Sequence, residues 1–546
     1  MHPSLDVKPS PSGSILEKTT PIYRHPVKSG QKHAWENPGS YAKGGELTHA
    51  HSVLDRRRAG ILLHITSLPG SPGNGDLGRN AHRFVDFLAD CGISVWQTLP
   101  INPTHADGSP YQCLSAHAGN PLMIDLEWLS DRGWLPSPPA YDEETSAVDY
   151  RRGCLMQAFD AFQKCSPGKY RGAYDEFAKK HDGWLSDYAL FIALREEFGS
   201  KAWQEWPAAI RDREPAALEA ARSGLADRIA QVKFEQFVFF EQWMELRRYA
   251  RQRGVRLFGD MPIFVAGDSA DVWACREFFD LTDTGYARVV AGVPPDYFSA
   301  TGQRWGNPHY NWERMKATGF RWWLDRFRSQ LALYDWVRID HFRGFEAYWE
   351  IPAESETAIH GRWVKAPGDT LLETVFATLN GSGLPLVAEN LGIITPEVEA
   401  LRSRFNIPGM LILQFAFDGG DDNPYLPHNH TENNVVYTGT HDNDTTLSWY
   451  ESLSETQRDR VRDYLRDHCD GRDAQMPQSL IECALASVAR LAVIPMQDVL
   501  ELGHGHRMNT PGTISGNWQW RFSWEQLTKP KAENLAAWVR DHGRRI

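Results

Sequence analysis

Several acidic residues of this chain stand in patterns that suit paired carboxylate chemistry. In Arg338-Ile-Asp340 the arginine and the aspartate are two residues apart, so on a strand their side chains point to the same side. A guanidinium beside a carboxylate lowers the pKa of the carboxylate and keeps it ionised, as a nucleophile requires. Glu389 offers a second carboxyl group, which in a less compensated pocket stays protonated as a general acid. A purely structural salt bridge between Arg338 and Asp340 is the alternative.

Two further acids, Asp260 and Asp442, also follow predicted strands. With 70 acidic residues in 546, eight strand ends would carry about one acid by chance, so this clustering exceeds chance modestly. Solvated loop acids or helix N-caps are the alternative. The segment His441-Asp-Asn-Asp444 could also suggest a metal cluster, but no His-x-Glu or His-Glu-x-x-His spacing accompanies it. We therefore expect no metal site.

Aromatic residues in polar loops point to the kind of ligand. The chain has 21 Trp, 18 Tyr and 25 Phe, and Tyr111, Tyr297 and Trp305 lie in segments rich in Gly and Pro. A sugar ring has an apolar face that stacks on aromatic rings and hydroxyls that need hydrogen bonds, so aromatics beside Asn, Asp and His suit a carbohydrate. Core packing is the alternative for most of these rings.

A glycine-rich segment raises the separate possibility of a dinucleotide site. Gly73-Asn-Gly-Asp-Leu-Gly78 matches the pattern G-x-G-x-x-G. In a dinucleotide fold the first glycine ends a strand and an acid closes the next strand about 20 residues later, whereas here residues 68–72 intervene and the next strand closes with Gln97-Thr-Leu-Pro100. We interpret the glycines as a turn and expect no organic cofactor.

The candidate residues need a scaffold that gathers many strand ends. From Ala59 onward, short apolar runs alternate with helical patterns, which is typical of repeated βα units. The runs predicted to be strands are residues 60–64, 94–99, 255–259, 336–339, 384–388, 410–415, 434–437 and 491–494. Active sites of (β/α)8 barrels lie at the carboxyl ends of the strands, where these acids stand. The predicted fold is α/β, a (β/α)8 TIM barrel with inserted, mainly helical subdomains.

Two segments fall outside the strand pattern. Residues 1–50 contain six Ser, six Pro and five Gly without apolar periodicity, which predicts a flexible leader over residues 1–55. A transit peptide is the alternative, but only Arg24 supplies the arginine expected of one. Apolar residues at spacings of three and four predict a helical insertion at about 100–254. The rest of residues 56–546 is assigned to the barrel.

Composition excludes several classes of protein. Hydrophobic residues make up 42% and charged residues 23%, as in folded globular domains, and a net charge of −12 with a pI of about 5.9 disfavours nucleic acid and anionic membranes as partners. The seven cysteines form no C-x-x-C pair, which suits a reducing compartment. No signal peptide and no run of 18 apolar residues are found. We expect a cytoplasmic location.

The ordered motifs of the chain resemble those of the amylomaltase (4-α-glucanotransferase, or disproportionating enzyme) family of (β/α)8 enzymes, from about Arg58 to Trp524. The motifs that carry the resemblance are GILLH (60–64), TSLPG (66–70), GDLG (75–78), SPYQ (109–112), AGNP (118–121), GDMP (259–262), DSADVW (268–273), GVPPDYF (292–298), RIDHFRG (338–344), AENLG (388–392), THDN (440–443) and RMN (507–509). So many motifs in one order are highly specific.

The resemblance implies roles for individual residues. Asp340 would be the nucleophile, Glu389 the general acid/base and Asp442 the carboxylate that stabilises the transition state, with Arg338 orienting Asp340. The other implied substrate-binding residues are His341, His441 and Asp260 as contacts to sugar hydroxyls, Tyr111 and Trp305 as stacking groups, and Ser109, Asp296 and Asn307 from the matching motifs. The loop at about 290–310 resembles the family's lid over the cleft.

The implied activity is the transfer of α-1,4-glucan segments to the 4-hydroxyl of an acceptor glucan or glucose by a retaining double displacement, without metal or cofactor. The expected partners are maltooligosaccharides, glycogen or starch, with glucose as an acceptor. A retaining α-glucan hydrolase would use the same carboxylates, and a noncatalytic glucan-binding protein is the alternative from another class. Residues 105–107 lack the aromatic that some members place before SPYQ, a departure that bears on a secondary glucan-binding patch.

Overall fold

Eight parallel strands form the centre of the molecule. The computed structural model describes residues 54–545, except residues 71, 139–140, 143, 166–167, 296–298, 380–382, 471–473 and 514. The strands are β1 (Arg58–Leu62), β2 (Val95–Gln97), β3 (Arg256–Pro262), β6 (Trp336–Asp340), β9 (Leu386–Ala388), β10 (Gly409–Ile412), β11 (Asn434–Tyr437) and β12 (Leu491–Pro495). Each one overlaps a strand predicted from the sequence, so the eight assignments are confirmed with small shifts at their ends.

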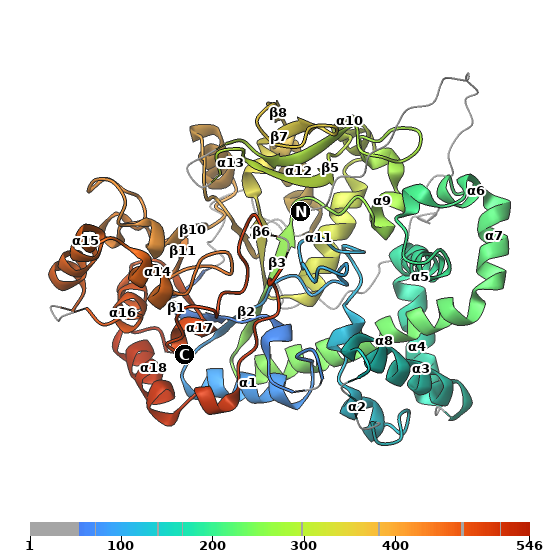
Figure 1. The fold of residues 1–546 in the computed structure, drawn as a ribbon, viewed down its shortest axis with the longest axis horizontal. Helices are drawn as coiled ribbons and strands as arrows, with labels where there is room; N and C mark the ends of the chain where they lie inside the picture. Colours follow the sequence, from blue (N-terminus) through green and yellow to red (C-terminus); the bar gives the residue numbers. More distant parts are fainter. Residues whose placement is uncertain are drawn as a thin grey trace.

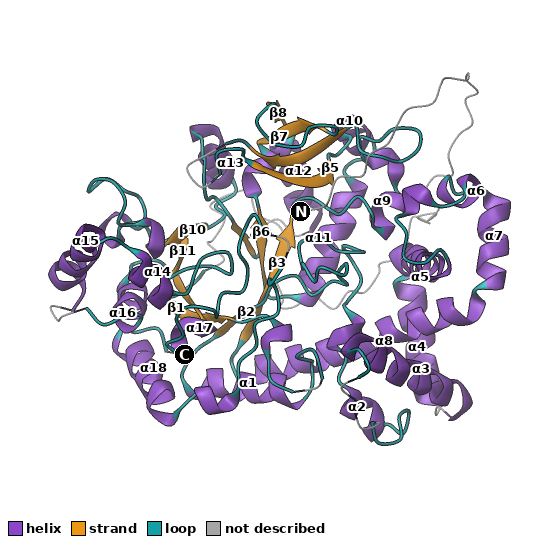
Figure 2. Cartoon of the chain, in the orientation of Figure 1, coloured by secondary structure: helices purple, strands orange, loops and turns teal. Residues whose placement is uncertain are grey.

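The strands close into a barrel. Their order is β10-β11-β12-β1-β2-β3-β6-β9, and β12 pairs with β1 in register Val493↔Gly60. At the remaining seam, the backbone N–H of Ala388 donates to the carbonyl of Pro408, just before β10, at 2.8 Å. Helices surround the strands (Figure 2). The predicted (β/α)8 barrel is therefore confirmed.

Alternating side chains separate the inside of the barrel from its outer layer. On β12, Leu491 and Val493 belong to a cluster shared with inward residues of other strands, such as Phe258 and Met410, whereas Ala492 and Ile494 pack in the larger cluster toward the helices. Both faces of the strands are thus buried, completely in β12 and β9 and except at the ends in β1, β3 and β6. This explains why the strands read as continuous apolar runs rather than as alternating patterns.

Helices fill the chain between β2 and β3, in the region of the expected insertion. They are α2 (Leu126–Asp131), α3 (Ala147–Cys165), α4 (Gly168–Lys180), α5 (Asp182–Glu197), α6 (Ala208–Arg211), α7 (Pro215–Gly224) and α8 (Ala226–Gln252), and α3 to α7 lie to one side of the strands at the right of Figure 1. The boundaries of the insertion, about 100–254, stay a prediction.

The long helix α8 anchors the segment that reaches over the barrel from β2. The side-chain amide of Gln236 accepts from the N–H of Gly119 at 2.8 Å and donates to its carbonyl at 2.9 Å. Gln242 makes the same pair of bonds with the backbone of Asp125, at 2.8 and 3.1 Å. Each buried amide thus satisfies both the N–H and the carbonyl of one backbone residue, as a neighbouring strand would. These bonds hold the segment, which also carries Tyr111, against α8.

The remaining helices mostly cover the outside of the barrel. They are α1 (Arg79–Asp90), α9 (Ala270–Ala274), α10 (Trp312–Ala317), α11 (Arg321–Leu333), α12 (Gly368–Leu379), α13 (Pro396–Arg404), α14 (Thr446–Ser452), α15 (Glu455–Leu465), α16 (Gln478–Ala486), α17 (Met496–Val499) and α18 (Lys529–Asp541). The described residues include no helix long and apolar enough to cross a membrane.

A second, antiparallel sheet that the sequence did not predict lies beyond the upper ends of β3 and β6 in Figure 1. It has the order β5-β4-β7-β8, with β4 (Val289–Val293), β5 (Gln303–Pro308), β7 (Ala347–Pro352) and β8 (Arg362–Lys365). The glycines and prolines of β4, β5 and the turn between them resemble a loop, which explains why the region 290–310 was expected to be one. The structure shows two strands there, and residues 296–298 lie outside the described residues. The expected leader also lies outside them, apart from its last two residues.

Candidate active site

Arg338 stands at the centre of a buried charge cluster where β3 and β6 end. Its Nη1 donates to both carboxylate oxygens of Asp260, at 2.8 and 2.6 Å, and its Nη2 pairs with Asp340 Oδ1 at 2.8 Å. The register of β3 and β6 places Asp260 opposite Arg338, and the alternation of β6 puts Asp340 on the same side. Arg338 is only 5% exposed and Asp260 1%.

The pKa of Asp340 is raised, whereas the neighbouring Arg338 alone would lower it. Burial raises the pKa of Asp340 to about 8; Arg338 lowers it, and the neighbouring carboxylates of Asp260 and Glu389 raise it again. One guanidinium is shared between two carboxylates, so it does not fully compensate either of them. Arg338 thus lowers the pKa of Asp340 as expected, but burial and the neighbouring carboxylates, which the sequence did not show, outweigh it.

Glu389 directly follows β9, on the neighbouring strand of the barrel. Its Oε2 accepts the backbone N–H of His341 and its Oε1 accepts that of Leu391, both at 2.7 Å. Burial raises the pKa of Glu389, against the lowering effects of Arg338 and of these two N–H groups. The second carboxyl group of the predicted pair is therefore held next to the first, with its pKa shifted in the direction that favours a proton donor.

His341, next to Asp340, adopts a backbone conformation that is costly for any residue other than glycine. Its φ is 55°, in the left-handed region, which costs on the order of 1 kcal/mol. From this conformation its N–H donates to Glu389 Oε2. Burial lowers the pKa of the imidazole to about 3, so the ring is neutral at physiological pH.

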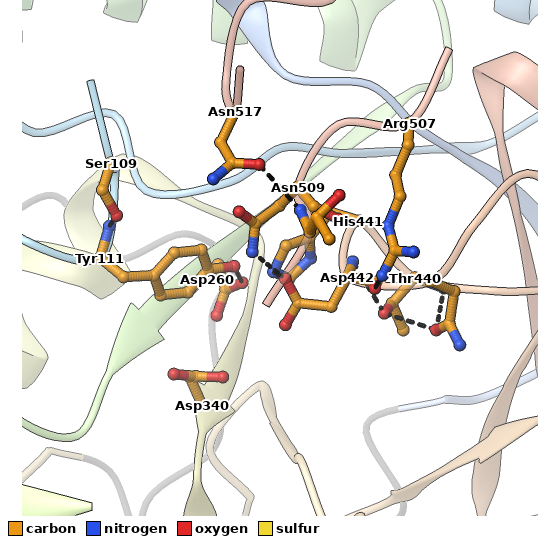
Figure 3. Close-up of polar contacts among 12 residues, drawn as sticks. Ser109, Tyr111, Asp260, Asp340, Thr440, His441, Asp442, Arg507, Asn509 and Asn517 are labelled. Atoms are coloured by element: carbon orange, nitrogen blue, oxygen red, sulfur yellow. Dashed lines mark hydrogen bonds and ion pairs between the residues drawn. The ribbon is translucent and has the colours of Figure 1, made fainter. Parts of the chain in front are cut away.

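Tyr111 and His441 form one wall of the cluster. The hydroxyl of Tyr111 donates to Asp260 Oδ2 at 2.7 Å, and its ring stacks on His441 with centroids 5.1 Å apart (Figure 3). Trp518 contacts both rings, at 5.8 and 6.0 Å. The predicted sugar-stacking ring of Tyr111 is thus bonded at its polar end and covered on one face by His441.

Asp442 lies on the loop between β11 and α14, facing Asp260 and Asp340 in Figure 3. Its side chain is 48% exposed, its Oδ1 accepts from Asn509 Nδ2 at 2.6 Å, and Nε2 of His441 is 3.4 Å away. Arg507 donates to the backbone carbonyl of Asp442 and, at 2.6 Å, to that of Asn509. Asp442, the third predicted carboxylate, is therefore more exposed than Asp340 and Glu389. Residues 507–509, which follow β12, hold it in place through hydrogen bonds.

Residues of β5 form the opposite wall. The ring of Trp305 meets the ring of His341 edge to face, with centroids 4.8 Å apart. Asn307 is buried, and its Nδ2 donates to the carbonyl of Val265 at 2.9 Å. Gln112 joins the two walls, because its Nε2 donates to Asn307 Oδ1 at 3.1 Å and to the carbonyl of Trp305 at 3.3 Å.

The last two predicted residues have different outcomes. Ser109 lies beside Tyr111, whose backbone N–H reaches its hydroxyl at 3.4 Å, so its visible effect is on the turn that presents the tyrosine. Asp296 lies outside the described residues. The structure thus brings eleven of the twelve predicted residues together, namely Asp340, Glu389, Asp442, Arg338, His341, His441, Asp260, Tyr111, Ser109, Trp305 and Asn307.

Sequence reasoning missed the residues that hold these groups in place. Gln112 and Asn509 were part of recognised motifs, but no spacing shows that their amides bond to Asn307 and Asp442. Trp518 belongs to no recognised motif and was not singled out, and its aromatic character in a polar segment is the one signal that could have found it. Asn517, whose Oδ1 accepts from the N–H of Thr510 at 2.9 Å, shapes the same segment (Figure 3).

The arrangement can perform a defined chemistry. Two carboxyl groups of raised pKa lie on adjacent strand ends, with a third carboxylate nearby, aromatic rings at the walls and neutral histidines. Carboxyl pairs of this kind supply a nucleophile or base and an acid for cleaving glycosidic bonds. In the part of the chain that the structure describes, no group of three or more His, Cys, Asp or Glu residues could hold a metal ion.

Comparison with known proteins adds an independent line of evidence. The model of the family described as 4-alpha-glucanotransferase matches residues 63–528. The chain is 48% identical to a 4-alpha-glucanotransferase of Synechocystis over 508 residues, covering 90% of this chain and 99% of that one. It is 49% identical to the Thermus thermophilus 4-alpha-glucanotransferase, covering 88% and 98%, and 43% identical to a Solanum tuberosum relative named as chloroplastic/amyloplastic, covering 86% and 82%.

Solved structures give the same assignment. The amylomaltase of Streptococcus agalactiae, solved in complex with acarbose, superposes with a TM-score of 0.86 at 38% identity and covers 90% of this chain and 100% of that one. The amylomaltase of Corynebacterium glutamicum superposes with a TM-score of 0.72 at 17% identity, covering 89% and 75%, which shows a shared fold.

Proposed function

The chain belongs to the 4-alpha-glucanotransferase family, and from this premise we propose which of its residues carry out the transfer. The enzyme moves an α-1,4-glucan segment from a donor to the 4-hydroxyl of an acceptor glucan by a retaining double displacement. In our proposal Asp340 is the nucleophile, Glu389 the acid/base and Asp442 the stabilising carboxylate. The observation that carries this assignment is the placement of Asp340 and Glu389 at the ends of the neighbouring strands β6 and β9, where Arg338 pairs with Asp340 and the N–H of His341 donates to Glu389.

In the first step, an oxygen of Asp340 attacks the anomeric carbon of the donor and the bond to the leaving oxygen breaks. Glu389 gives its proton to that oxygen, so the leaving glucan departs with a free 4-hydroxyl and a β-linked glycosyl ester remains on Asp340. In the second step Glu389, now ionised, accepts the proton of the acceptor 4-hydroxyl. The acceptor oxygen attacks the same carbon, the ester bond breaks, and the α configuration returns.

The protonation states required for this sequence fit the electrostatics of the pair. Both pKa values are raised, so the two carboxyl groups together retain a proton near neutral pH. Arg338 contacts Asp340 directly, at 2.8 Å, which favours the charge on Asp340 and the proton on Glu389. The carboxylates of Asp340, Asp260 and Asp442 outnumber the one guanidinium, so the site favours the positive charge that develops at the anomeric carbon.

The remaining predicted residues hold the reacting sugar in our proposal. Asp260, His441 and His341 contact hydroxyls, and Tyr111 and Trp305 supply the apolar surfaces. Asp296, in the segment expected to be a lid, is proposed as a further contact to the sugar on the strength of its motif alone. Neutral imidazoles support these roles, because they can each donate and accept one hydrogen bond.

We also propose the finer properties of the substrates and of the location. Glucose can act as an acceptor, because the second step needs only a 4-hydroxyl and one sugar ring. Maltooligosaccharides, glycogen or starch would serve as donors. A cytoplasmic location is supported by the spacing of the seven cysteines in the sequence, which form no C-x-x-C pair.

Two experiments test the proposal. Incubation with maltotriose should give a ladder of longer chains plus glucose, whereas a hydrolase gives glucose and maltose alone and a binding protein gives no change. The Glu389→Gln variant, given α-glucosyl fluoride, should accumulate a glycosyl-enzyme, because the fluoride needs little acid help in the first step but the second step lacks its base. Peptide mass spectrometry should place the sugar on Asp340; a sugar on another residue, or a β-configured first product by NMR, overturns the assignment.

A further inference from the structure

A buried carboxylate outside the group described above holds both ends of the loop that carries His441 and Asp442. Asp498 lies on α17, just after β12, and is 1% exposed. Its Oδ2 accepts from the hydroxyls of Thr438 and Thr446, at 2.6 and 2.7 Å. Its Oδ1 accepts the backbone N–H of Thr446 at 2.8 Å.

The two threonines mark the boundaries of this loop. Thr438 directly follows β11, and Thr446 is the first residue of α14, so residues 439–445 lie between them. Both threonines are fully buried. Because the carboxylate of Asp498 bonds to both threonines, it fixes the distance between the two ends of the loop. It thereby also sets the position of the loop relative to the ends of the barrel strands.

The loop itself is organised by a second set of hydrogen bonds. The N–H and the hydroxyl of Thr440 both donate to Asn443 Oδ1, at 2.9 and 2.8 Å, which makes a tight turn around Asp442 (Figure 3). The turn can move as one body if its base moves. The position of the Asp442 carboxylate therefore depends on the base of the loop as well as on Asn509 above it.

We propose that Asp498 is a positioning residue for the transfer reaction and that it acts through Asp442. This inference rests on the role of Asp442 proposed above. Asp498 touches no reacting group, and the groups that bond to it in the described structure are two hydroxyls and one N–H. Burying a carboxylate costs stability unless its hydrogen bonds are well made, so its three short, directed bonds serve placement of the loop at the expense of stability.

The first test is the Asp498→Asn variant of the full chain. The amide keeps the size of the side chain but replaces one acceptor oxygen with a donor facing the two hydroxyls. We expect kcat for maltotriose to fall by about 10-fold or more with KM within about twofold, since only stabilisation of the transition state is lost. A kcat within twofold of the unmodified enzyme overturns the proposal.

Thr438 provides a milder test if Asp498→Asn folds poorly. Thr438→Val removes the hydroxyl at nearly constant volume, whereas Thr438→Ser keeps it. The valine variant should lose kcat by several-fold and the serine variant should retain it. Equal losses in both variants contradict a role for the hydrogen bond to Asp498.

Asp335→Asn is the matched control for a general loss of stability. Asp335 is also a buried carboxylate, but it lies at the other end of β6, where it accepts from Arg251 Nε at 2.8 Å and from the N–H of Leu257 at 3.0 Å. This variant should lower Tm while kcat stays within about twofold. A similar loss of kcat in both asparagine variants makes the effect a structural one and overturns the proposal.

A double-mutant cycle separates this inference from the proposed function. If Asp498 acts through Asp442, Asp442→Asn should lose nearly all activity and adding Asp498→Asn should lower kcat no further. If the losses in kcat of the two single variants multiply in the double variant, the positioning role of Asp498 is overturned and the proposed role of Asp442 stands. A fully active Asp442→Asn variant overturns the role of Asp442, and the inference with it.

Discussion

The backbone N–H of His341 donates to Glu389 Oε2 at 2.7 Å, so the residue next to the proposed nucleophile holds the proposed acid/base. The bond joins β6 to the end of β9 and depends on the left-handed conformation of His341. Together with the N–H of Leu391 on the other oxygen, it fixes the Glu389 carboxyl group beside the end of β6, where Asp340 stands.

The raised pKa values predict an unusual acidic limb in the pH profile. Asp340 must be ionised to attack, so kcat/KM falls as pH drops through the apparent pKa of the Asp340–Glu389 pair. Because burial raises the pKa of Asp340 to about 8, this limb should lie far above the ordinary aspartate value of 3.8. Initial rates with maltotriose between pH 4 and 10, controlled for enzyme stability, measure it. A limb near pH 4 contradicts the prediction.

The basic limb belongs to Glu389 in our proposal. Loss of its proton stops assistance to the leaving oxygen, so activity should fall again at high pH. Glu389→Gln removes the titrating group, and its residual kcat/KM should show no basic limb. Persistence of that limb unchanged in the purified variant assigns the acid to a different residue.

Asp340→Asn should stabilise the folded protein, and more so at high pH. The folded-state pKa of Asp340, about 8, exceeds its ordinary value of 3.8, so the folded state binds the proton more tightly and its stability declines as pH rises between these values. The asparagine variant escapes this decline, while Arg338 keeps its bonds to Asp260. Tm measured at pH 5 and pH 9 should differ less in the variant than in the unmodified enzyme. An equal decline in both shows that Asp340 does not titrate in this range.

Tyr111→Phe tests the hydroxyl that bonds to Asp260 at 2.7 Å. Its loss should reduce kcat/KM by about 10-fold, because one charge-assisted hydrogen bond is worth about 1.5–3 kcal/mol. Tyr310→Phe is the control, since that buried hydroxyl donates at 2.6 Å to the carbonyl of Ile263. The control should lower Tm and leave kcat/KM nearly unchanged; the reverse pattern places Tyr111 outside the site.

Deletion of residues 1–52 should leave turnover nearly intact. The composition of that segment offers too little apolar burial to offset the roughly 1–2 kcal/mol per residue that ordering costs. The deletion spares Leu54, which is 1% exposed and packs with residues inside the barrel. Leu54→Ala is the contrasting change and should cost about 2–5 kcal/mol of stability. A tenfold loss of activity in a folded truncation contradicts the prediction.

The sequence predicted the barrel because its strands are buried on both faces and therefore appear as separate apolar runs. It did not predict the antiparallel sheet, because strands such as β5 are rich in Gly, Pro and Asn and only half-buried. The proposed nucleophile Asp340 is the last residue of β6 and the proposed acid/base Glu389 directly follows β9, at the strand ends where barrel active sites lie. Asn509 and Asp498 lie far from Asp442 in sequence, and no pattern specifies which donor meets which acceptor.

The net pKa shift of Asp340 could not be predicted from the sequence for a related reason. Two residues on one strand suggested a simple pair between Arg338 and Asp340, and that contact exists. The stronger double contact of Arg338 with Asp260 comes from a neighbouring strand 78 residues away in sequence. A pKa depends on all charges within a few ångströms, so it requires the three-dimensional arrangement.

The pairing of β12 with β1 has a consequence for how the enzyme is made. Val493 and Gly60 are neighbours in the sheet, although they are separated by most of the chain. During synthesis one edge of β1 stays unpaired until β12 has been made. The other edge of β1 can pair with β2, and β2 with β3, much earlier. Such long-range closure slows folding and exposes an open strand edge to association. The site can therefore assemble only after nearly all of the chain has been synthesised, and a truncation before Leu491 should accumulate as aggregate rather than as a weakened enzyme.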